Sequence, residues 1–200
     1  MFGKDEMAHM VQPAATYEDL KAVPPHLVAE ILFGRLVTHP RPVPRHAIAT
    51  NALSAVLTPP FQFAHGGPGG WIFMDEPELH LGEHVAVPDL AGWRRERMAV
   101  LPKTAWMELA PDWICEVLSP ATERYDRGDK RTIYAQQGVR HLWHVDPQPQ
   151  ILEVFEIRDG RWLLINVFQG GEEAGAPPFS ELRFSLTLLW PFDPSAATDG

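Results

Sequence analysis

The strongest constraint in this sequence is the run from Trp113 to Leu118, which is apolar except for one carboxylate, Glu116. A short continuous apolar run is typical of a strand that is buried on both faces. Burying an unpaired carboxylate there costs free energy, so Glu116 must find a metal ion, a cation or hydrogen-bond donors. Successive side chains of a strand point to opposite faces, so Cys115 should point away from Glu116 into apolar packing. The run therefore predicts a buried strand with a polar site on one side.

Composition limits the class of protein. The chain has 200 residues, 45% of them hydrophobic and 22% charged, which is typical of one globular domain. It carries 17 basic against 26 acidic residues, a net charge of −9. This balance excludes a protein that coats nucleic acid by charge alone, so any contact with DNA must be local or assisted by a metal ion.

The sequence also predicts a cytoplasmic protein that does not enter a membrane. Cys115 is the only cysteine, which excludes an intramolecular disulfide and a multi-cysteine zinc site and favours a reducing compartment. Acids occur early at the amino terminus and no apolar run follows them, so we find no secretory signal. The longest charge-free stretch, residues 47–64, is interrupted by polar residues and prolines, which excludes a transmembrane helix there.

The expected organisation is one domain over residues 16–192, with flexible segments at residues 1–15 and 193–200. A capped helix should begin at Thr16 and end before Pro24, and a glycine turn at Gly34 should join two strands within residues 27–38. A helix over residues 45–57 should end at Pro59, and the glycine-rich residues 66–70 should form a loop.

Later segments alternate between short strands and one helix. The helix is expected over residues 123–137, ending at Gly138, and Asp159-Gly160 should form a tight hairpin turn. The remaining expected strands cover residues 71–74, 78–81, 85–88, 113–118, 141–145, 151–157 and 162–168. Many strands with few helices predict an α+β fold rather than a doubly wound sheet.

Four residues stand out as candidates for chemistry: Glu30, Asp89, Glu116 and Lys130. Two carboxylates at neighbouring strand ends suffice to hold Mg²⁺, because this ion prefers oxygen ligands and keeps several waters. A metal held in this way generates hydroxide from bound water and neutralises charge on a phosphoryl oxygen, while an ammonium group orients the attacking water. The combination predicts hydrolysis of phosphodiester bonds.

Four ordered motifs resemble one family: residues 87–90 (VPDL), 116–122 (EVLSPAT), 125–130 (YDRGDK) and the segment from Gly138 to Pro147. The chain resembles the Uma-type restriction endonuclease family of the PD-(D/E)XK nuclease superfamily, from about Glu30 to Phe168. The resemblance implies a restriction-endonuclease-like mixed β-sheet flanked by helices, with an added antiparallel hairpin. It also implies a divalent metal ion, Mg²⁺ or Mn²⁺, between Asp89 and Glu116, and a homodimer, whereas most members of the family lack an established substrate.

One position departs from the superfamily pattern. The lysine that usually stands two residues after the second acid is replaced by Leu118, which cannot orient water. By resemblance Lys130 matches the lysine that this family carries on the next helix. Glu30 matches its early acid, as a metal ligand or a residue that orders water. His46 is an auxiliary candidate.

Other interpretations remain open from the sequence. Asp89 after a proline is typical of a turn, and Asp126 and Lys130 stand four residues apart, which favours a solvent-exposed salt bridge. The basic residues 94–97 favour a solvated loop over phosphate binding. The leading hypothesis is a divalent-metal-dependent nuclease that acts on DNA. The alternative is a catalytically inactive dimer that keeps the nuclease fold as a binding or interaction module.

Overall fold

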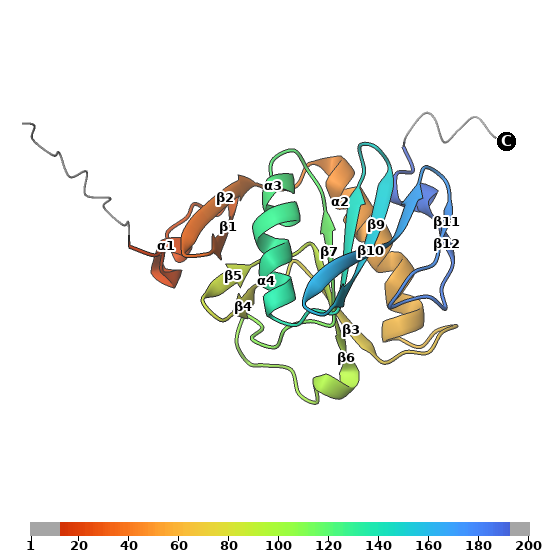
Figure 1. Cartoon of the computed structure of the whole chain (residues 1–200), viewed down its shortest axis with the longest axis horizontal. Helices are drawn as coiled ribbons and strands as arrows, with labels where there is room; N and C mark the ends of the chain where they lie inside the picture. Colours follow the sequence, from red (N-terminus) through yellow and green to blue (C-terminus); the bar gives the residue numbers. More distant parts are fainter. Residues whose placement is uncertain (1–12, 193–200) are drawn as a thin grey trace, which may run out of the picture.

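The central layer is a six-stranded sheet with the strand order β10-β9-β8-β7-β6-β3 (Figure 1). The structure is a computed structural model that describes residues 13–192. Of the segments expected to be flexible, residues 1–15 and 193–200, all but residues 13–15 lie outside the described residues. Its strands are β3 (Trp71–Asp75), β6 (Leu90–Arg94), β7 (Trp113–Val117), β8 (His141–Asp146), β9 (Ile151–Arg158) and β10 (Arg161–Gln169).

The sheet is mixed, and its register brings two acids to one edge. Strands β7 and β8 are parallel, whereas the other neighbouring pairs are antiparallel. Because β6 and β7 are antiparallel, with Leu90 opposite Cys115, the start of β6 meets the end of β7. Asp89, just before β6, therefore lies near Glu116 in the second half of β7.

Helices cover both faces of this sheet (Figure 1). On one face α2 (Pro44–Leu57) packs through Ala49, Leu53 and Leu57 into an apolar cluster with alternate residues of β7. The other face carries α3 (Glu123–Tyr125), a π-helical turn (Asp126–Lys130) and α4 (Arg131–Gln136), which form one continuous helical segment. Ile133 and Tyr134 of α4 pack with Ile114 in a second cluster.

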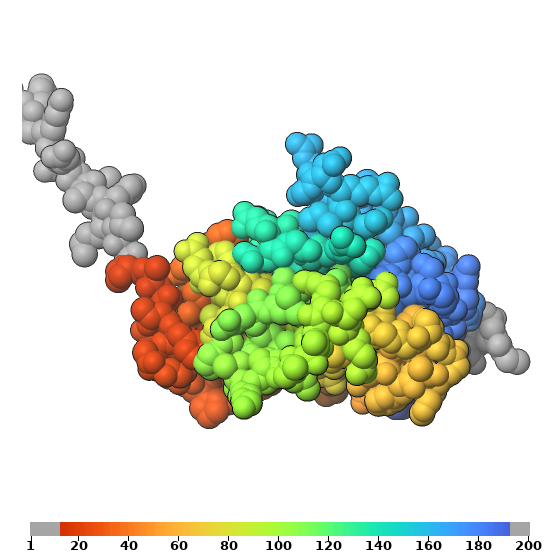
Figure 2. Space-filling view, turned by 90° about the horizontal axis from the view of Figure 1, so that it is seen from below, coloured from red at the N-terminus to blue at the C-terminus, as the bar shows by residue number. Residues whose placement is uncertain are grey.

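Smaller elements flank this core. A four-stranded sheet with the order β2-β1-β5-β4 follows α1 (Tyr17–Lys21), and a two-stranded sheet pairs β11 with β12. Their bounds are β1 (Leu27–Leu32), β2 (Arg35–Pro40), β4 (Leu79–Leu81), β5 (His84–Ala86), β11 (Glu173–Ala174) and β12 (Phe184–Ser185). The short helices are a π turn (Thr58–Gln62) and the 3₁₀ turns Arg95–Arg97 and Leu186–Leu189. Figure 2 shows the loop between β6 and β7 in lime, between the N-terminal hairpin and the gold glycine-rich loop.

The predicted α+β class and most predicted elements are confirmed. Thr16 caps α1 through a reciprocal capping box with Asp19, and Gly34 turns the β1–β2 hairpin with a φ of 70°. Asp159 and Gly160 turn the β9–β10 hairpin with φ values of 50° and 72°. In residues 13–192 we find no helix with the length and apolar character that crossing a bilayer requires.

Two parts of the fold differ from the sequence prediction. Strand β6 was not expected, because its glycine weakens the strand signal. A Cβ atom at Gly92 would lie 2.9 Å from the Phe73 ring, so the missing side chain makes room for this ring. The helix predicted to end at the prolines does end at Leu57, but an unexpected π turn follows it, in which the Phe63 N–H donates to the Thr58 carbonyl at 3.1 Å.

Candidate active site

A buried lysine lies at the centre of the candidate site. The ammonium nitrogen of Lys130, whose side chain is 4% exposed, is 2.9 Å from Glu116 Oε1, 3.2 Å from Asp126 Oδ1 and 3.3 Å from Glu30 Oε1. It also donates a hydrogen bond to the Val87 carbonyl at 3.3 Å. We call Lys130 and these three acids the lysine cluster. The structure thus brings together three of the residues that the sequence proposed.

The helical segment on this face places Lys130. Asp126 and Lys130 are the first and last residues of the π turn, and both are buried. The ion pair expected between them forms, but the prediction that it is exposed to solvent is wrong. The side chains are 3% and 4% exposed because the segment packs this face against the end of β7.

Glu30, on strand β1 of the N-terminal sheet, contacts Lys130. Its Oε1 atom accepts the Val87 N–H at 2.8 Å, and its Oε2 atom lies 3.5 Å from His39 Nε2. Burial raises the pKa of the Glu30 carboxyl, but the charge of Lys130 and the donors from His39 and Val87 outweigh it and hold this pKa below its ordinary value. Glu30 is therefore a carboxylate with its oxygens bound by protein groups.

Asp89 is oriented by two neighbouring elements. Its Oδ2 atom accepts the Val117 N–H at 2.7 Å, and its Oδ1 atom lies 3.1 Å from His46 Nε2. Burial lowers the pKa of the His46 imidazole, but the hydrogen bond with Asp89 and the charge of Asp89 together outweigh this effect. The net shift of the His46 pKa is therefore upward. His46, on the first turns of α2, thus contacts one of the two candidate metal ligands.

Glu116 is held by a residue that the sequence analysis did not single out as part of the site. The buried Tyr134 hydroxyl donates a hydrogen bond to Glu116 Oε1 at 2.6 Å. Burial raises the pKa of the Glu116 carboxyl, and the negative charges of Asp126 and Asp89 add to this, so the shift is upward despite Lys130. Burial lowers the pKa of the Lys130 ammonium group, but the charges of the surrounding acids outweigh this effect and raise the pKa well above its ordinary value. The cluster therefore holds a charged lysine amid an excess of acids.

A cavity of about 280 Å³ opens beside these groups. Its wall includes Asp89, Glu116, Asp126, Lys130 and His46. Glu30 is not part of the wall that the described residues form, because its oxygens face Lys130, Val87 and His39. A second, more open hollow of about 730 Å³ adjoins this cavity, and His46 lies in the walls of both.

The donor set of this cavity fits a hard divalent cation that keeps part of its water shell. Three carboxylates, those of Asp89, Glu116 and Asp126, line the cavity together with a single ammonium group, that of Lys130, and this excess of acids is what a divalent ion would offset. Within residues 13–192 no three His, Cys, Asp or Glu side chains gather in the geometry of a metal centre. Asp89 and Glu116 would therefore need water and substrate oxygens to complete the shell.

The sequence contained a signal for the two residues that it did not assign to the site. Asp126, Lys130 and Tyr134 are spaced by four residues each, so they recur on one face of a helix. The sequence predicted a solvent-exposed salt bridge for Asp126 and no role for Tyr134 in the site. The prediction for Cys115 is confirmed, since it is buried in the apolar cluster on the face opposite Glu116.

Comparisons with known proteins identify the family and the fold. The sequence model of the Uma2 family, described as "Putative restriction endonuclease", matches residues 14–188. A solved structure from Anabaena variabilis ATCC 29413, titled a "putative nuclease belonging to DUF820", is similar with a TM-score of 0.68 and 21% identity. The match covers 88% of this chain and 98% of that chain. No curated protein matches the sequence. The expected restriction-endonuclease-like fold is confirmed.

Proposed function

Because this chain belongs to the Uma2 family of restriction endonuclease-type proteins, we propose that it is a divalent-metal-dependent nuclease that hydrolyses phosphodiester bonds of DNA. The observation that carries the proposal is that Asp89, Glu116 and Lys130 line one cavity. The family resemblance and the single cysteine support a homodimer that acts in the cytoplasm.

Asp89 and Glu116 are the residues that would hold Mg²⁺ or Mn²⁺. When bound, such an ion lowers the pKa of a coordinated water and offsets charge on a phosphoryl oxygen. The protein fixes both carboxylates in advance: the Val117 N–H and His46 orient Asp89, and the Tyr134 hydroxyl orients Glu116. Fixed ligands reduce the cost of organising the site during the reaction.

Lys130 supplies the positive charge that the superfamily pattern places two residues after the second acid. Leu118 at that position is 4% exposed and apolar. Lys130 reaches the same strand end from the helical segment and contacts Glu116 at 2.9 Å. Its ammonium group, held charged by the acids around it, orients the attacking water or stabilises a phosphoryl oxygen in this proposal.

One observation favours the alternative of a catalytically inactive module. Lys130 already contacts three carboxylates and the Val87 carbonyl, an arrangement that also satisfies a purely structural ion cluster. In that case the acids would stabilise the packing of the N-terminal sheet against the helical segment, and cleavage would not occur.

A cleavage assay tests the proposal. The full chain is incubated with supercoiled plasmid, duplex and single-stranded oligonucleotides and RNA, with Mg²⁺, Mn²⁺ or EDTA. We expect metal-dependent cleavage of DNA that falls more than about 100-fold in Asp89→Asn and Glu116→Gln, since even indirect losses at a metal site cost 10- to 100-fold. Asp159→Asn, at the exposed hairpin turn, is the matched control. Equal cleavage in Asp89→Asn and wild type would contradict the proposal.

A further inference from the structure

A hollow of about 520 Å³ lies at the edge of the six-stranded sheet opposite the candidate active site. It is formed by the end of β6, the turn after it, and the starts of β7 and β8. Residues that line it include Arg94, Glu96, Arg97, Asp112, Arg140 and His141. We call this hollow the arginine pocket.

The arginine pocket is separate from the lysine cluster. Asp89 precedes β6 and Arg94 ends it, so they stand at opposite ends of this strand. At about 3.3 Å per residue, five residues of strand place their Cα atoms roughly 16 Å apart. A ligand that occupies one site therefore leaves the other open.

Among residues 13–192, two guanidinium groups of the pocket have no acidic partner. Arg97 pairs with Asp112 at 2.7 Å, and the other oxygen of Asp112 accepts the Arg94 backbone N–H at 2.8 Å. The Arg94 guanidinium stacks on the Trp71 ring, 4.3 Å from its centroid. Neither the Arg94 nor the Arg140 side chain forms a salt bridge within the part of the chain that the structure describes.

A histidine adds a polar group without a partner. The Nδ1 atom of His141 is buried and, among residues 13–192, has no hydrogen-bond partner. Burial lowers the pKa of this imidazole, and the charges of Arg140 and Arg94 lower it further. An imidazole N–H can donate a hydrogen bond to an anion beside the two guanidinium groups.

We propose that the arginine pocket binds the phosphate group of a nucleotide-sized ligand. Guanidinium groups match the geometry of phosphate and donate paired hydrogen bonds to it. The volume is within the range of small-molecule sites and exceeds what a bare phosphate fills. A free mononucleotide and the terminal phosphate of a nucleic acid share this chemistry.

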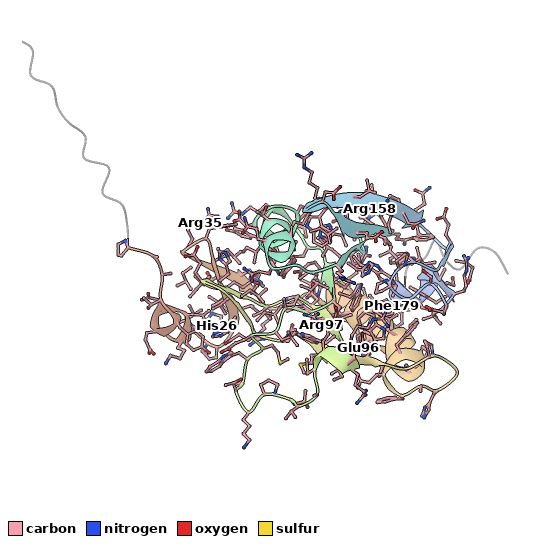
Figure 3. All side chains as sticks on the ribbon, turned by 60° about the horizontal axis from the view of Figure 1, so that its bottom comes forward. His26, Arg35, Glu96, Arg97, Arg158 and Phe179 are labelled. Carbon is pink, nitrogen blue, oxygen red and sulfur yellow. The ribbon has the colours of Figure 1, made fainter. Side chains whose placement is uncertain are left out.

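The acid at the rim provides a control of opposite sign. Glu96 is exposed on the 3₁₀ turn beside Arg97, and Figure 3 labels both side chains at this turn. Its charge opposes an anion in the pocket, whereas Arg140 attracts it. Replacing each by glutamine should therefore change the affinity in opposite directions.

The test titrates inorganic phosphate, 5′-dAMP and deoxyadenosine into the full chain by calorimetry, in EDTA so that no metal bridges ligands to the acidic site. We expect saturable binding of phosphate and 5′-dAMP but not of the nucleoside. Arg140→Gln should weaken binding about tenfold, because a charge-assisted hydrogen bond is lost. Glu96→Gln should strengthen it, and Lys21→Gln, on the distant helix α1, should leave it unchanged.

Oligonucleotides with and without a 5′-phosphate distinguish the two sources. Tighter binding of the 5′-phosphorylated oligonucleotide than of 5′-dAMP assigns the pocket to a nucleic-acid end, and the reverse assigns it to a free nucleotide. Absence of saturable phosphate and 5′-dAMP binding in wild type overturns the proposal. So does equal affinity in wild type and a folded Arg140→Gln. Asp89→Asn should bind phosphate with the affinity of wild type, because Asp89 lies outside the arginine pocket. Failure of the proposed nuclease function can therefore be distinguished from failure of phosphate binding in this pocket.

Discussion

The two faces of β7 bury opposite kinds of chemistry within five residues. Trp113, Cys115 and Val117 point into an apolar cluster, where Phe179 packs 5.1 Å from the Trp113 ring and 5.7 Å from the Trp143 ring. On the other face Glu116 meets the ammonium group of Lys130. Every residue of the strand is buried.

The difference separates packing that stabilises the fold from packing that retains a site. Apolar burial lowers the free energy of the folded state in proportion to area. A buried ion cluster is often no more stable than apolar residues of similar volume, although breaking it is costly. We therefore expect the apolar face to stabilise the sheet, whereas the lysine cluster is the candidate for the proposed function.

The largest expected effect comes from breaking the lysine cluster. Lys130→Met leaves three carboxylates without their cation and should lower the free energy of unfolding by about 4 kcal/mol. Urea denaturation measures this change, with Lys21→Met on α1 as the exposed control. Adding Glu116→Leu to Lys130→Met should restore part of the loss. A loss below 1 kcal/mol would show that the cluster is not the buried ion network described.

The opposite face should respond in stability alone. Phe179→Ala removes a ring that contacts aromatic side chains of β7 and β8, and should cost about 3 kcal/mol. Its Mn²⁺ affinity, measured at a temperature where the variant is folded, should equal that of wild type. A folded Phe179→Ala with weakened Mn²⁺ affinity would break the separation between the two faces.

A smaller effect should come from Tyr134→Phe, which removes only the hydroxyl that holds Glu116. The loss of this hydrogen bond should lower the free energy of unfolding by about 1–2 kcal/mol. If Glu116 binds metal, Mn²⁺ affinity should also fall by about 10- to 100-fold. Calorimetry beside urea denaturation separates these outcomes, and unchanged metal affinity would assign Tyr134 to packing alone.

The smallest effect concerns pH. The folded pKa of His46 is raised above its ordinary value of 6.5, because the hydrogen bond and charge of Asp89 outweigh burial. A raised histidine pKa stabilises the folded state fully below pH 6.5, and this contribution is lost as pH rises through the folded pKa. His46→Gln should flatten the stability profile in that window. An identical pH slope in wild type and variant would contradict the ion pair.

Local signals in the sequence were sufficient for much of the fold. Each of these signals involves only a few neighbouring residues and predicts a helix, turn or strand without knowledge of the fold. They are the capping box at Thr16, the turn glycines and the apolar run at Trp113–Leu118. Strand β6 was missed because Gly92 weakens the strand signal. The reason for this glycine is the close approach of Phe73 on the neighbouring strand, which the sequence alone does not show. The π turn at Thr58–Gln62 was missed as well, because its two prolines predict the end of a helix and its backbone hydrogen bond has no signature in the sequence.

The sequence was sufficient to predict the candidate acids of the site, but not the neighbouring residues that hold them in place. A carboxylate in an apolar strand is costly wherever it lies, so Glu116 stood out without knowledge of its neighbours. Whether the Asp126–Lys130 pair is buried depends on which face of the helical segment packs inward, and this is set by tertiary contacts. The two unpaired arginines of the arginine pocket come from segments more than 40 residues apart, so no local pattern joins them.

The most direct test of the central claim is calorimetric titration of Mn²⁺ into wild type, Asp89→Asn, Glu116→Gln and the control Asp159→Asn, with circular dichroism confirming that each is folded. We predict saturable binding in wild type and Asp159→Asn, and its loss in both site variants. Equal Mn²⁺ binding in all four proteins would contradict a metal site at Asp89 and Glu116, and absence of binding in wild type would favour the inactive module.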